Sequence, residues 1–342
     1  MATPQNPAQA QDYARMMGMV TGFWITQTVR AAAVYKLADH LAEGTDTPEA
    51  IAAAEDIDLD ATRRLLRTCA SLGLMTSPDG GAHYRGTSLL STLHKEDPNS
   101  LRGFAISQAA PGHWLPWGRF SEAIRTGQHQ ITAAHGDATI FEYFARHLDE
   151  AAFFTESMGN LSRAAAQDIA AVIDTSDVKL ALDLGGANGE VIRAMMTANP
   201  HLHGGVFDLP HIAPDAAAAA RADGLEERFS AVGGDFFEAV PSADLYILKY
   251  VLHDWDDDAC VRILKNCNAS LREGGRVVIV DYLIPEIGTP GIAPLMDMNM
   301  LAMTGGRERQ TTEFDALFAA AGLRRTNITS AGGFAVIEAT TV

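Results

Sequence analysis

The sequence predicts an α/β protein with two parts: a mainly α-helical N-terminal half and a mostly parallel sheet that ends in an antiparallel hairpin. From residue 8 to about 170, apolar residues recur at helical spacing. After Asp177, short apolar runs alternate with helical segments at the spacing of βαβ units, which is typical of a parallel sheet buried on both faces. The last two runs are joined through Gly332-Gly333, a link so short that they must be antiparallel neighbours. We therefore expect two domains, residues 1–170 and 171–342.

Composition excludes several classes of partner. The 342 residues carry a formal net charge of −17, which would repel phosphate backbones and anionic lipids, so we expect neither nucleic acid nor a membrane as a partner. Cys69, Cys260 and Cys267 are too few and too scattered for a disulfide framework or a CxxC metal site. We find no signal peptide and no apolar run long enough to span a bilayer, and we expect a cytoplasmic protein.

The N-terminal half opens with elements that together predict a winged-helix unit. Helical spacing covers residues 8–42, and a second helix is predicted after Thr47, a good N-cap that is followed by Pro48. A third helix opens at residue 60 and stops at Gly73. Its apolar side consists of Leu65, Leu66, Cys69 and Leu72. The glycine-rich turn at residues 78–81 then predicts a short hairpin, the wing.

Two functions suit such a unit. The third helix carries Arg63, Arg64 and Arg67, which could contact DNA as in other winged-helix proteins. The alternative is a structural or dimerising module. The acidity of the whole chain favours the second interpretation.

The C-terminal half is predicted to contain seven strands and three clear helices. The strands are expected at residues 179–184, 204–208, 229–233, 244–249, 276–281, 324–329 and 334–340, and the helices at 190–199, 213–222 and 256–272.

Candidate ligand-binding residues follow three of these strands, at the edge of the sheet where open α/β folds bind their ligands. A glycine-rich turn, Gly185 to Gly189, follows the first strand, and Asp208 lies roughly 20 residues further on, where a carboxylate suits a ribose diol. The G-x-G-x-x-G order of dinucleotide enzymes is missing. Asp235 and Phe236 follow the third strand and suit the amine and ring of an adenine. The set fits an adenosyl group that bears an amino acid.

Five motifs in this order, LDLGGANG, VFDLP, GDFF, LKYVLHDW and GGRERQ, resemble those of the S-adenosylmethionine-dependent O-methyltransferases of the caffeate, phenazine and anthracycline type. The resemblance covers nearly the whole chain. It implies a Rossmann-like sheet of seven strands, a winged-helix dimerisation domain at the N-terminus, S-adenosyl-L-methionine as the cofactor, a small aromatic acceptor, and a homodimer formed through the N-terminal domain.

The resemblance also implies roles for individual residues. Gly185 should contact the methionine part of the cofactor, Asp208 its ribose, and Asp235 with Phe236 its adenine, and Lys249 matches a further cofactor contact. His253 matches the general base, and Asp281 and Glu308 match two acids beside it. GGANG replaces the commoner GGGxG. Asp281 stands where many relatives have Glu, so its distance to His253 is an open point.

A histidine base restricts the acceptor chemistry. Proton transfer from a phenol with a pKa near ~10 to an imidazole with a pKa near ~6.5 is uphill by roughly 5 kcal/mol, which is within reach of a positioned base. The pKa of an aliphatic alcohol is too high for such a base. A carboxylate on the other ring nitrogen would fix the tautomer. We see no metal-ligand cluster, because Asp256 to Asp258 are better explained as the start of a helix.

The acceptor site is predicted from aromatic, sulfur-containing and acidic side chains. Its candidates are Trp114, Phe154, Met158, Asp254 and Met300. Ordinary core packing explains each of the apolar ones equally well. The remaining histidines, His113 among them, are expected at the surface.

Two other functions remain open. A relative with the same cofactor site could hydroxylate or decarboxylate an aromatic polyketide, and a winged-helix regulator could bind DNA.

Overall fold

The computed structural model describes residues 7–342 and divides into two compact units. The first unit runs to Trp114 and includes His147–Asn160, and the second consists of Leu115–Arg146 and Leu161–Val342. The functional division at residues 170 and 171 stays a prediction. None of the helices in the described part is long and apolar enough to cross a membrane.

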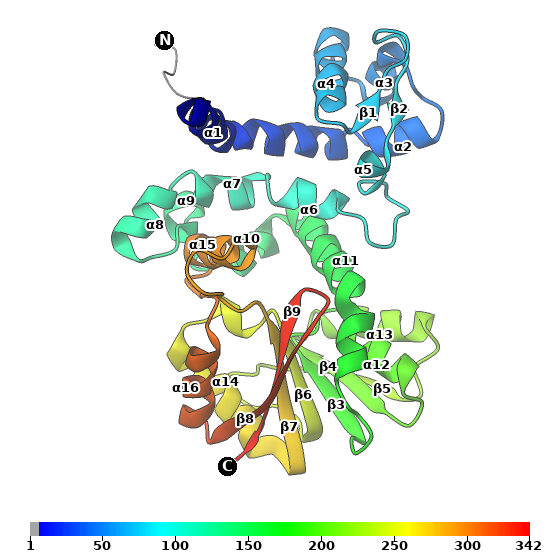
Figure 1. The fold of residues 1–342 in the computed structure, drawn as a ribbon. Coiled ribbons are helices and arrows are strands. Elements are labelled where there is room, and N and C mark those ends of the chain that lie inside the picture. The colour runs from blue at the N-terminus through cyan, green and yellow to red at the C-terminus, as the bar shows by residue number, and fades with distance from the viewer. Residues whose placement is uncertain (1–6) are drawn as a thin grey trace. The chain divides into compact units, whose positions relative to one another are not determined.

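The first unit contains the predicted helices and wing (Figure 1). Its elements are α1 (Pro7–Val34), α2 (Leu37–Ala42), α3 (Pro48–Glu55), α4 (Leu59–Ser71), β1 (Met75–Thr76), β2 (Arg85–Gly86), α5 (Ser88–Ser91), α6 (Arg102–Ser107) and the starts of α7 (Pro111–Trp117) and α11 (Leu148–Val172). The hydroxyl of Thr47 accepts a hydrogen bond from the amide of Ala50 at 3.2 Å, as its N-cap position predicts. The wing strands β1 and β2 pair antiparallel, as predicted.

Two expectations for this unit need correction. The helical pattern over residues 8–42 is interrupted, because Lys36 adopts a left-handed conformation (φ 49°) that separates α1 from α2. His113 was predicted at the surface but is only 4% exposed, and burial lowers its pKa to about 4 because it disfavours the charged ring. Its ring lies against that of Phe154 on α11, with centroids 5.8 Å apart.

The second unit contains α8 (Phe120–Thr126), α9 (Ile131–His135) and α10 (Ile140–Arg146), followed by the sheet. The later elements are β3 (Leu180–Leu184), α12 (Glu190–Ala198), β4 (His203–Asp208), α13 (Ala213–Ala222), β5 (Phe229–Gly233), β6 (Ala243–Lys249), the 3₁₀ turn η1 (Leu252–Asp254), α14 (Asp257–Ser270), β7 (Leu271–Asp281), α15 (Ala293–Met303), α16 (Thr311–Ala320), β8 (Leu323–Ala331) and β9 (Phe334–Thr341).

The sheet has the strand order β5-β4-β3-β6-β7-β9-β8 (Figure 1). The first five strands are parallel and β9 is antiparallel to both of its neighbours, which confirms the predicted fold class. The order reverses at β3, so that the loops after β3 and β6 open at the switch point where such sheets bind ligands.

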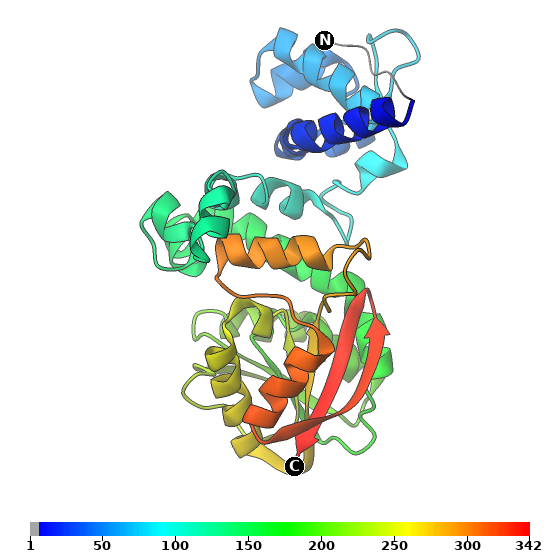
Figure 2. The same ribbon diagram turned by 60° about the vertical axis from the view of Figure 1, so that its left-hand side comes forward.

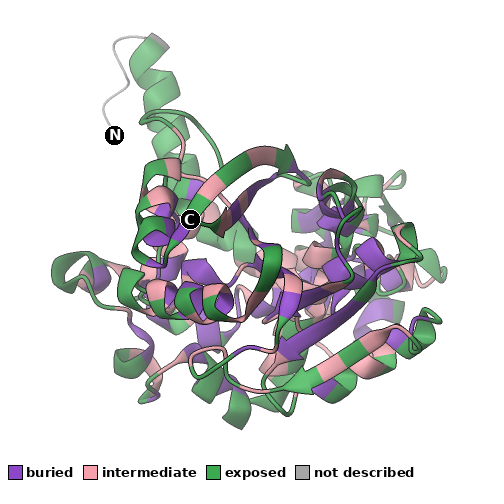
Figure 3. Cartoon of the chain, turned by 90° about the horizontal axis from the view of Figure 1, so that it is seen from below, coloured by how far each residue is buried: buried purple, intermediate pink, exposed green. Residues whose placement is uncertain are grey.

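Helices cover both faces of the sheet, as Figures 1 and 2 show. One core cluster joins α12, α13 and the end of α11 to side chains such as Ile247 and Val278, and the other joins α14 and α16 to Tyr246 and Ile279. Neighbouring residues therefore face opposite cores, and β6 and the end of β7, residues 277–281, are buried on both sides. Figure 3 shows the buried stretches of the chain in purple. This continuous burial explains why these strands read as unbroken apolar runs.

Candidate active site

The glycine-rich turn after β3 is tied to the end of β4. The amide of Gly185 donates to the carbonyl of Phe207 at 2.9 Å, and the amide of Ala187 donates to the Asp208 carboxylate at 2.9 Å. Gly185 has φ +70°, and a Cβ at this position would lie 2.9 Å from the side chain of Val251 and 3.8 Å from Phe236. The turn thus needs a glycine for both conformation and space, and it brings Gly185 close to Phe236.

Asp208 and Asp235 have different surroundings. Asp208 is half-buried and accepts from the amides of Ala187 and Leu209, and burial raises its pKa. Asp235 is exposed and accepts from the amide of Phe237 at 2.8 Å. Asn266 on α14 donates to the carbonyl of Phe236 at 2.9 Å, which holds this turn in place. Both carboxylates keep oxygen lone pairs for a ligand.

Lys249 ends β6 and is 8% exposed. Its ammonium donates to the hydroxyl of Ser162 at 3.0 Å and lies over the rings of Tyr250 and Phe334, 4.3 and 5.0 Å from their centroids. Burial lowers the pKa of Lys249 to about 8, although Asp183 and Asp281 act in the opposite direction.

The sequence analysis did not select Asp183, which the structure places beneath the glycine-rich turn. It is 3% exposed, and its Oδ1 has no hydrogen-bond partner among the described residues. Burial raises its pKa to about 7. A Cβ on Gly186 would lie 2.5 Å from the Asp183 carboxyl carbon, so the turn closes directly over this acid. An acidic residue inside an apolar strand was the signal that could have found it.

His253 lies in η1, directly after β6, and is 7% exposed. Its Nδ1 is 2.8 Å from Oε1 of Glu308, and its ring stacks on Tyr250 with centroids 4.8 Å apart and an interplanar angle of 14°. The Asp254 carboxylate lies on the other side, 3.9 Å from Nε2. If Nδ1 carries the proton donated to Glu308, Nε2 keeps its lone pair.

The environment of His253 favours the charged ring. Burial alone would lower the pKa of His253, but Asp254, the hydrogen bond that Glu308 accepts, and Asp281 together raise it to about 9. These carboxylates favour the doubly protonated ring, and Nε2 can act as a base only when the ring is neutral.

Asp281 does not make the hydrogen bond to the imidazole. Its Oδ1 accepts from the backbone amide of Tyr250 at 3.0 Å, and its Oδ2 has no hydrogen-bond partner in the described part of the chain. Tyr250 has a left-handed backbone (φ 56°), which is strained for a bulky residue. Asp281 thus holds the backbone of the residue that stacks on His253. Burial raises the pKa of Asp281 to about 7.

Glu308 is carried by a loop that packs on the backbone of η1. The amide of Glu308 donates to Asp297 on α15 at 3.0 Å, and the amide of Arg307 donates to the carbonyl of His253 at 2.8 Å. A Cβ on Gly306 would overlap the carbonyl of His253. The close contact between the backbones of residues 306–307 and His253 therefore sets the distance between the His253 ring and the Glu308 carboxylate.

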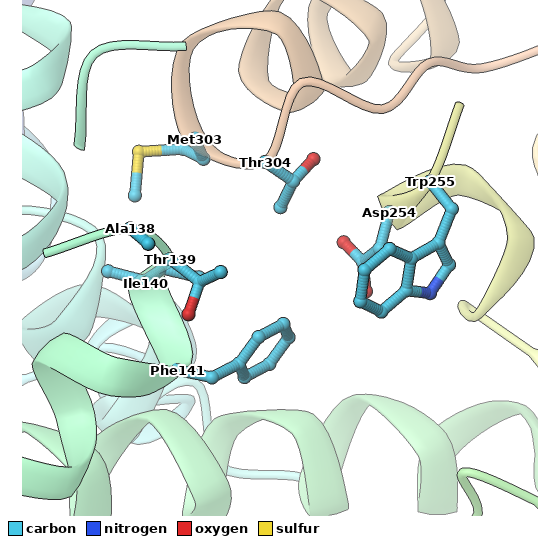
Figure 4. A pocket seen from close by; sticks show the side chains of 8 residues that line it. All are labelled: Ala138, Thr139, Ile140, Phe141, Asp254, Trp255, Met303 and Thr304. Carbon is cyan, nitrogen blue, oxygen red and sulfur yellow. The ribbon is translucent and has the colours of Figure 1, made fainter. Parts of the chain in front are cut away.

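A small pocket lies beside Asp254, with a volume of about 20 Å³. Its lining residues are Ala138, Thr139, Ile140, Phe141, Asp254, Trp255, Met303 and Thr304, which Figure 4 shows around the opening. The space holds about one water molecule, too little for an aromatic ring by itself. Burial raises the pKa of Asp254 to about 6, against the opposing effect of His253.

The predicted acceptor residues are divided between the two units. Trp114, Phe154 and Met158 belong to the first unit, and Met300 and Asp254 to the second. Met300 is buried on α15, 6% exposed, and its neighbours Met303 and Thr304 line the pocket instead.

Comparison with known proteins decides the family. Residues 117–324 match the O-methyltransferase domain, and residues 17–96 match the O-methyltransferase dimerisation domain. The chain belongs to the O-methyltransferase family. It is an S-adenosylmethionine-dependent enzyme with a dimerisation domain, as the five motifs predict.

Its relatives act in aromatic metabolism. This O-methyltransferase is 32% identical to the phenazine O-methyltransferase PhzM of Lysobacter antibioticus over 326 residues, 95% of each chain. The solved structure of the mitomycin 7-O-methyltransferase MmcR aligns with a TM-score of 0.91 and 31% identity, covering 98% of this chain and 99% of that one. Human N-acetylserotonin methyltransferase, solved with S-adenosylmethionine, aligns at 0.88 and 28% identity, covering 100% and 99%.

The residues present suit this cofactor. The orphaned Oδ1 of Asp183 and the carboxylate of Asp208 are acceptors for a cationic, amine-bearing ligand, and the space left by Gly185 and Gly186 lets the ligand approach the backbone. Lys249 and the amides at the start of α12 suit its carboxylate.

Proposed function

We propose that this O-methyltransferase methylates a phenolic hydroxyl of a small aromatic acceptor without a metal ion, with His253 as the general base. The observation that carries the proposal is the buried pair of His253 and Glu308, 2.8 Å apart, with Nε2 of the imidazole on the opposite side of the ring. Aromatic acceptors in relatives such as the phenazine O-methyltransferase support the acceptor class.

The proton and the methyl group move separately. The cofactor supplies an electrophilic methyl group on a sulfonium when it is bound. Nε2 of His253 takes the phenolic proton and passes it to solvent. With the cofactor bound, the phenolate oxygen would form its bond to the methyl carbon as the carbon–sulfur bond breaks, which would leave a neutral thioether. Glu308 stabilises the imidazolium, as a carboxylate on the far ring nitrogen does in other base-catalysed reactions.

The remaining predicted residues keep their roles within this proposal. Gly185, Asp208, Asp235, Phe236 and Lys249 bind the cofactor, with Asp183 added beneath the turn. Asp254, with its pKa raised and its carboxylate at the pocket, orients the acceptor. The apolar contacts with the acceptor are assigned to Trp114, Phe154, Met158 and Met300. The domain division at residue 170 separates acceptor capping and dimerisation from cofactor binding.

Replacement of the base tests the proposal. His253→Asn should lower kcat by roughly 10²–10⁴-fold while the cofactor dissociation constant, measured by calorimetry, changes little. The exposed His203, at the start of β4, provides the matched control in His203→Asn. Near-normal turnover of His253→Asn would refute the base assignment.

Two measurements separate the alternatives. A product heavier than the acceptor by one CH₂ group marks methyl transfer, whereas hydroxylation or decarboxylation changes the mass differently. A chelator should leave the rate unchanged, and a strong loss of rate would indicate a metal-dependent reaction instead.

The homodimer is proposed from the dimerisation domain and from the exposed apolar side chains of α1. Trp24, Met19 and Val20 are 61%, 61% and 60% exposed. Trp24→Asp should produce monomers in light scattering, whereas Asp12→Asn on the same helix should not. A wild-type protein that is monomeric at micromolar concentration would contradict the proposal.

A further inference from the structure

We propose that Arg309 is a positioning residue that holds the turn carrying His253 against the loop carrying Glu308. The inference rests on the proposed role of His253 and adds a residue that touches neither the ring nor the acid. Arg309 is 1% exposed and is the largest fully buried side chain of the described chain. A buried guanidinium needs a partner for each of its donors, and those partners indicate its role.

Every donor of the Arg309 guanidinium is used. Nε donates to Asp257 at 3.0 Å. Nη1 donates to the carbonyls of Leu252 and Arg307 at 2.9 and 3.4 Å, and Nη2 to the carbonyl of Trp255 and to Asp257 at 2.9 and 2.7 Å. The planar fork of arginine suits such a set, whereas the single ammonium of lysine cannot reach carbonyls in two directions at once.

The acceptors of these bonds lie before and after His253 in the chain. Leu252 begins the η1 turn and Trp255 follows it, and the carbonyl of His253 itself accepts from the amide of Arg307 at 2.8 Å. A turn of one 3₁₀ repeat has little internal hydrogen bonding to fix it. The thiol of Cys260 on α14 also donates to the carbonyl of Leu252, at 3.2 Å, and the charged donors come from residues 307–309, which lie more than 50 positions away in the chain.

The backbone of Arg309 is fixed as well as its side chain. Its carbonyl accepts from the amide of Ile284 at 3.1 Å, and residue 309 forms a parallel bridge with Leu283, just beyond β7. Glu308 comes directly before it and is held by Asp297. Residues 307–309 are thus bonded to the segment after β7, to α15 and to η1. These bonds hold Glu308 at 2.8 Å from His253.

A purely stabilising role is the competing explanation. Asp257 lies in the first turn of α14, and its ion pair with Arg309 could simply anchor that helix. The side chain of Asp257 is 59% exposed, so water competes for this pair. The bond to the carbonyl of Leu252 is buried and the bond to that of Trp255 is partly buried, so water competes less for them, and both acceptors belong to the turn and the residue after it rather than to the helix.

The test compares Arg309→Lys and Arg309→Met with Asp257→Asn and the control Asp258→Asn, a neighbouring acid on α14. We expect both Arg309 variants to lower kcat by roughly 10–100-fold while the cofactor dissociation constant stays within about threefold. The acidic limb of the pH–rate profile should move to lower pH, because the imidazolium loses its aligned carboxylate. Asp257→Asn keeps an amide oxygen as acceptor and should stay within about threefold of wild type.

Three outcomes would overturn the inference. These are an Arg309→Lys enzyme with near-normal kcat, a loss of kcat that matches an equal loss of cofactor affinity, and a failure of both Arg309 variants to fold, which would assign Arg309 to stability alone. His253→Asn separates this inference from the proposed function. If His253→Asn is inactive and Arg309→Lys is normal, the base assignment stands and only the role of Arg309 is wrong.

Discussion

The carboxylate of Glu308 lies 2.8 Å from Nδ1 of His253, while the Asp254 carboxylate lies 3.9 Å from Nε2. The two sides of the imidazole therefore have different partners. The hydrogen-bonded side faces the buried Glu308, and the other side faces Asp254, which lines the pocket. This asymmetry is what a base needs if one nitrogen is to be oriented and the other is to accept a proton.

Glu308→Gln should lower kcat by roughly 10–100-fold and shift the acidic limb of the pH–rate profile downward. The sign follows from the charge: Glu308 helps to raise the pKa of His253 to about 9, so its neutralisation lowers that pKa. Steady-state rates between about pH 6 and 10 measure the shift. Exposed Glu227 provides the control Glu227→Gln. An acidic limb that moves upward would contradict the assignment.

Asp281→Ala should cost far more activity than Asp281→Asn. The amide of Asn can still accept from the Tyr250 backbone, whereas Ala leaves that N–H unpaired at a cost of about 1–3 kcal/mol and releases a strained residue. We expect at least a tenfold difference in kcat between the two variants, measured at saturating substrates. Equal losses would indicate that the charge of Asp281, rather than its hold on Tyr250, is what matters.

Gly185→Ala should abolish tight cofactor binding, and Gly224→Ala should not. Both glycines have left-handed backbones, φ +70° and +68°, so both variants pay a similar conformational cost of roughly 1–2 kcal/mol. A Cβ would meet Val251 at position 185 but nothing within 4 Å at position 224. Calorimetric titration with S-adenosylmethionine separates the effects. Equal affinities in the two variants would show that the close contact has no influence on the site.

Asp183→Asn should stabilise the free enzyme and weaken cofactor binding. Burial raises the pKa of Asp183 to about 7, so the folded protein binds more protons than the unfolded chain between pH 4 and 7. The stability of the free enzyme therefore falls as pH rises through that range, and the neutral amide removes this penalty. We expect a thermal midpoint at pH 8 higher by roughly 2–8 °C, with a smaller further rise on adding cofactor. Asp215→Asn on α13 is a surface control.

Much of the fold could be predicted because the sheet is buried on both faces. α13 spans Ala213–Ala222 and β5 spans Phe229–Gly233, with the bounds expected from the apolar pattern. β7 begins at Leu271, five residues before the expected start, because Leu271 pairs with Ala243 across a register shift that no local pattern reveals. His113 was misplaced because a polar residue type says little about the neighbours that bury it.

Some residues of the candidate site could likewise be predicted from the sequence, and others could not. Gly185, Asp208, Phe236 and His253 follow strands and could be found from motif and position, and the structure brings the first three together. Asp183 and Arg309 were missed, although both lie inside the motifs. Their roles depend on contacts between distant segments, such as the bonds from Arg309 to Leu252 and Asp257, and only the folded chain shows these partners.

Gly306 has a consequence for engineering the acceptor range of the enzyme. A library that varies residues 306–309 would mainly sample proteins whose base has moved, since a side chain at 306 collides with the backbone of His253. Phe141, one of the residues that line the small pocket, is 46% exposed, so a substitution at this position meets less of the surrounding protein. Diversity introduced there can reshape which substituents fit while the chemistry stays intact.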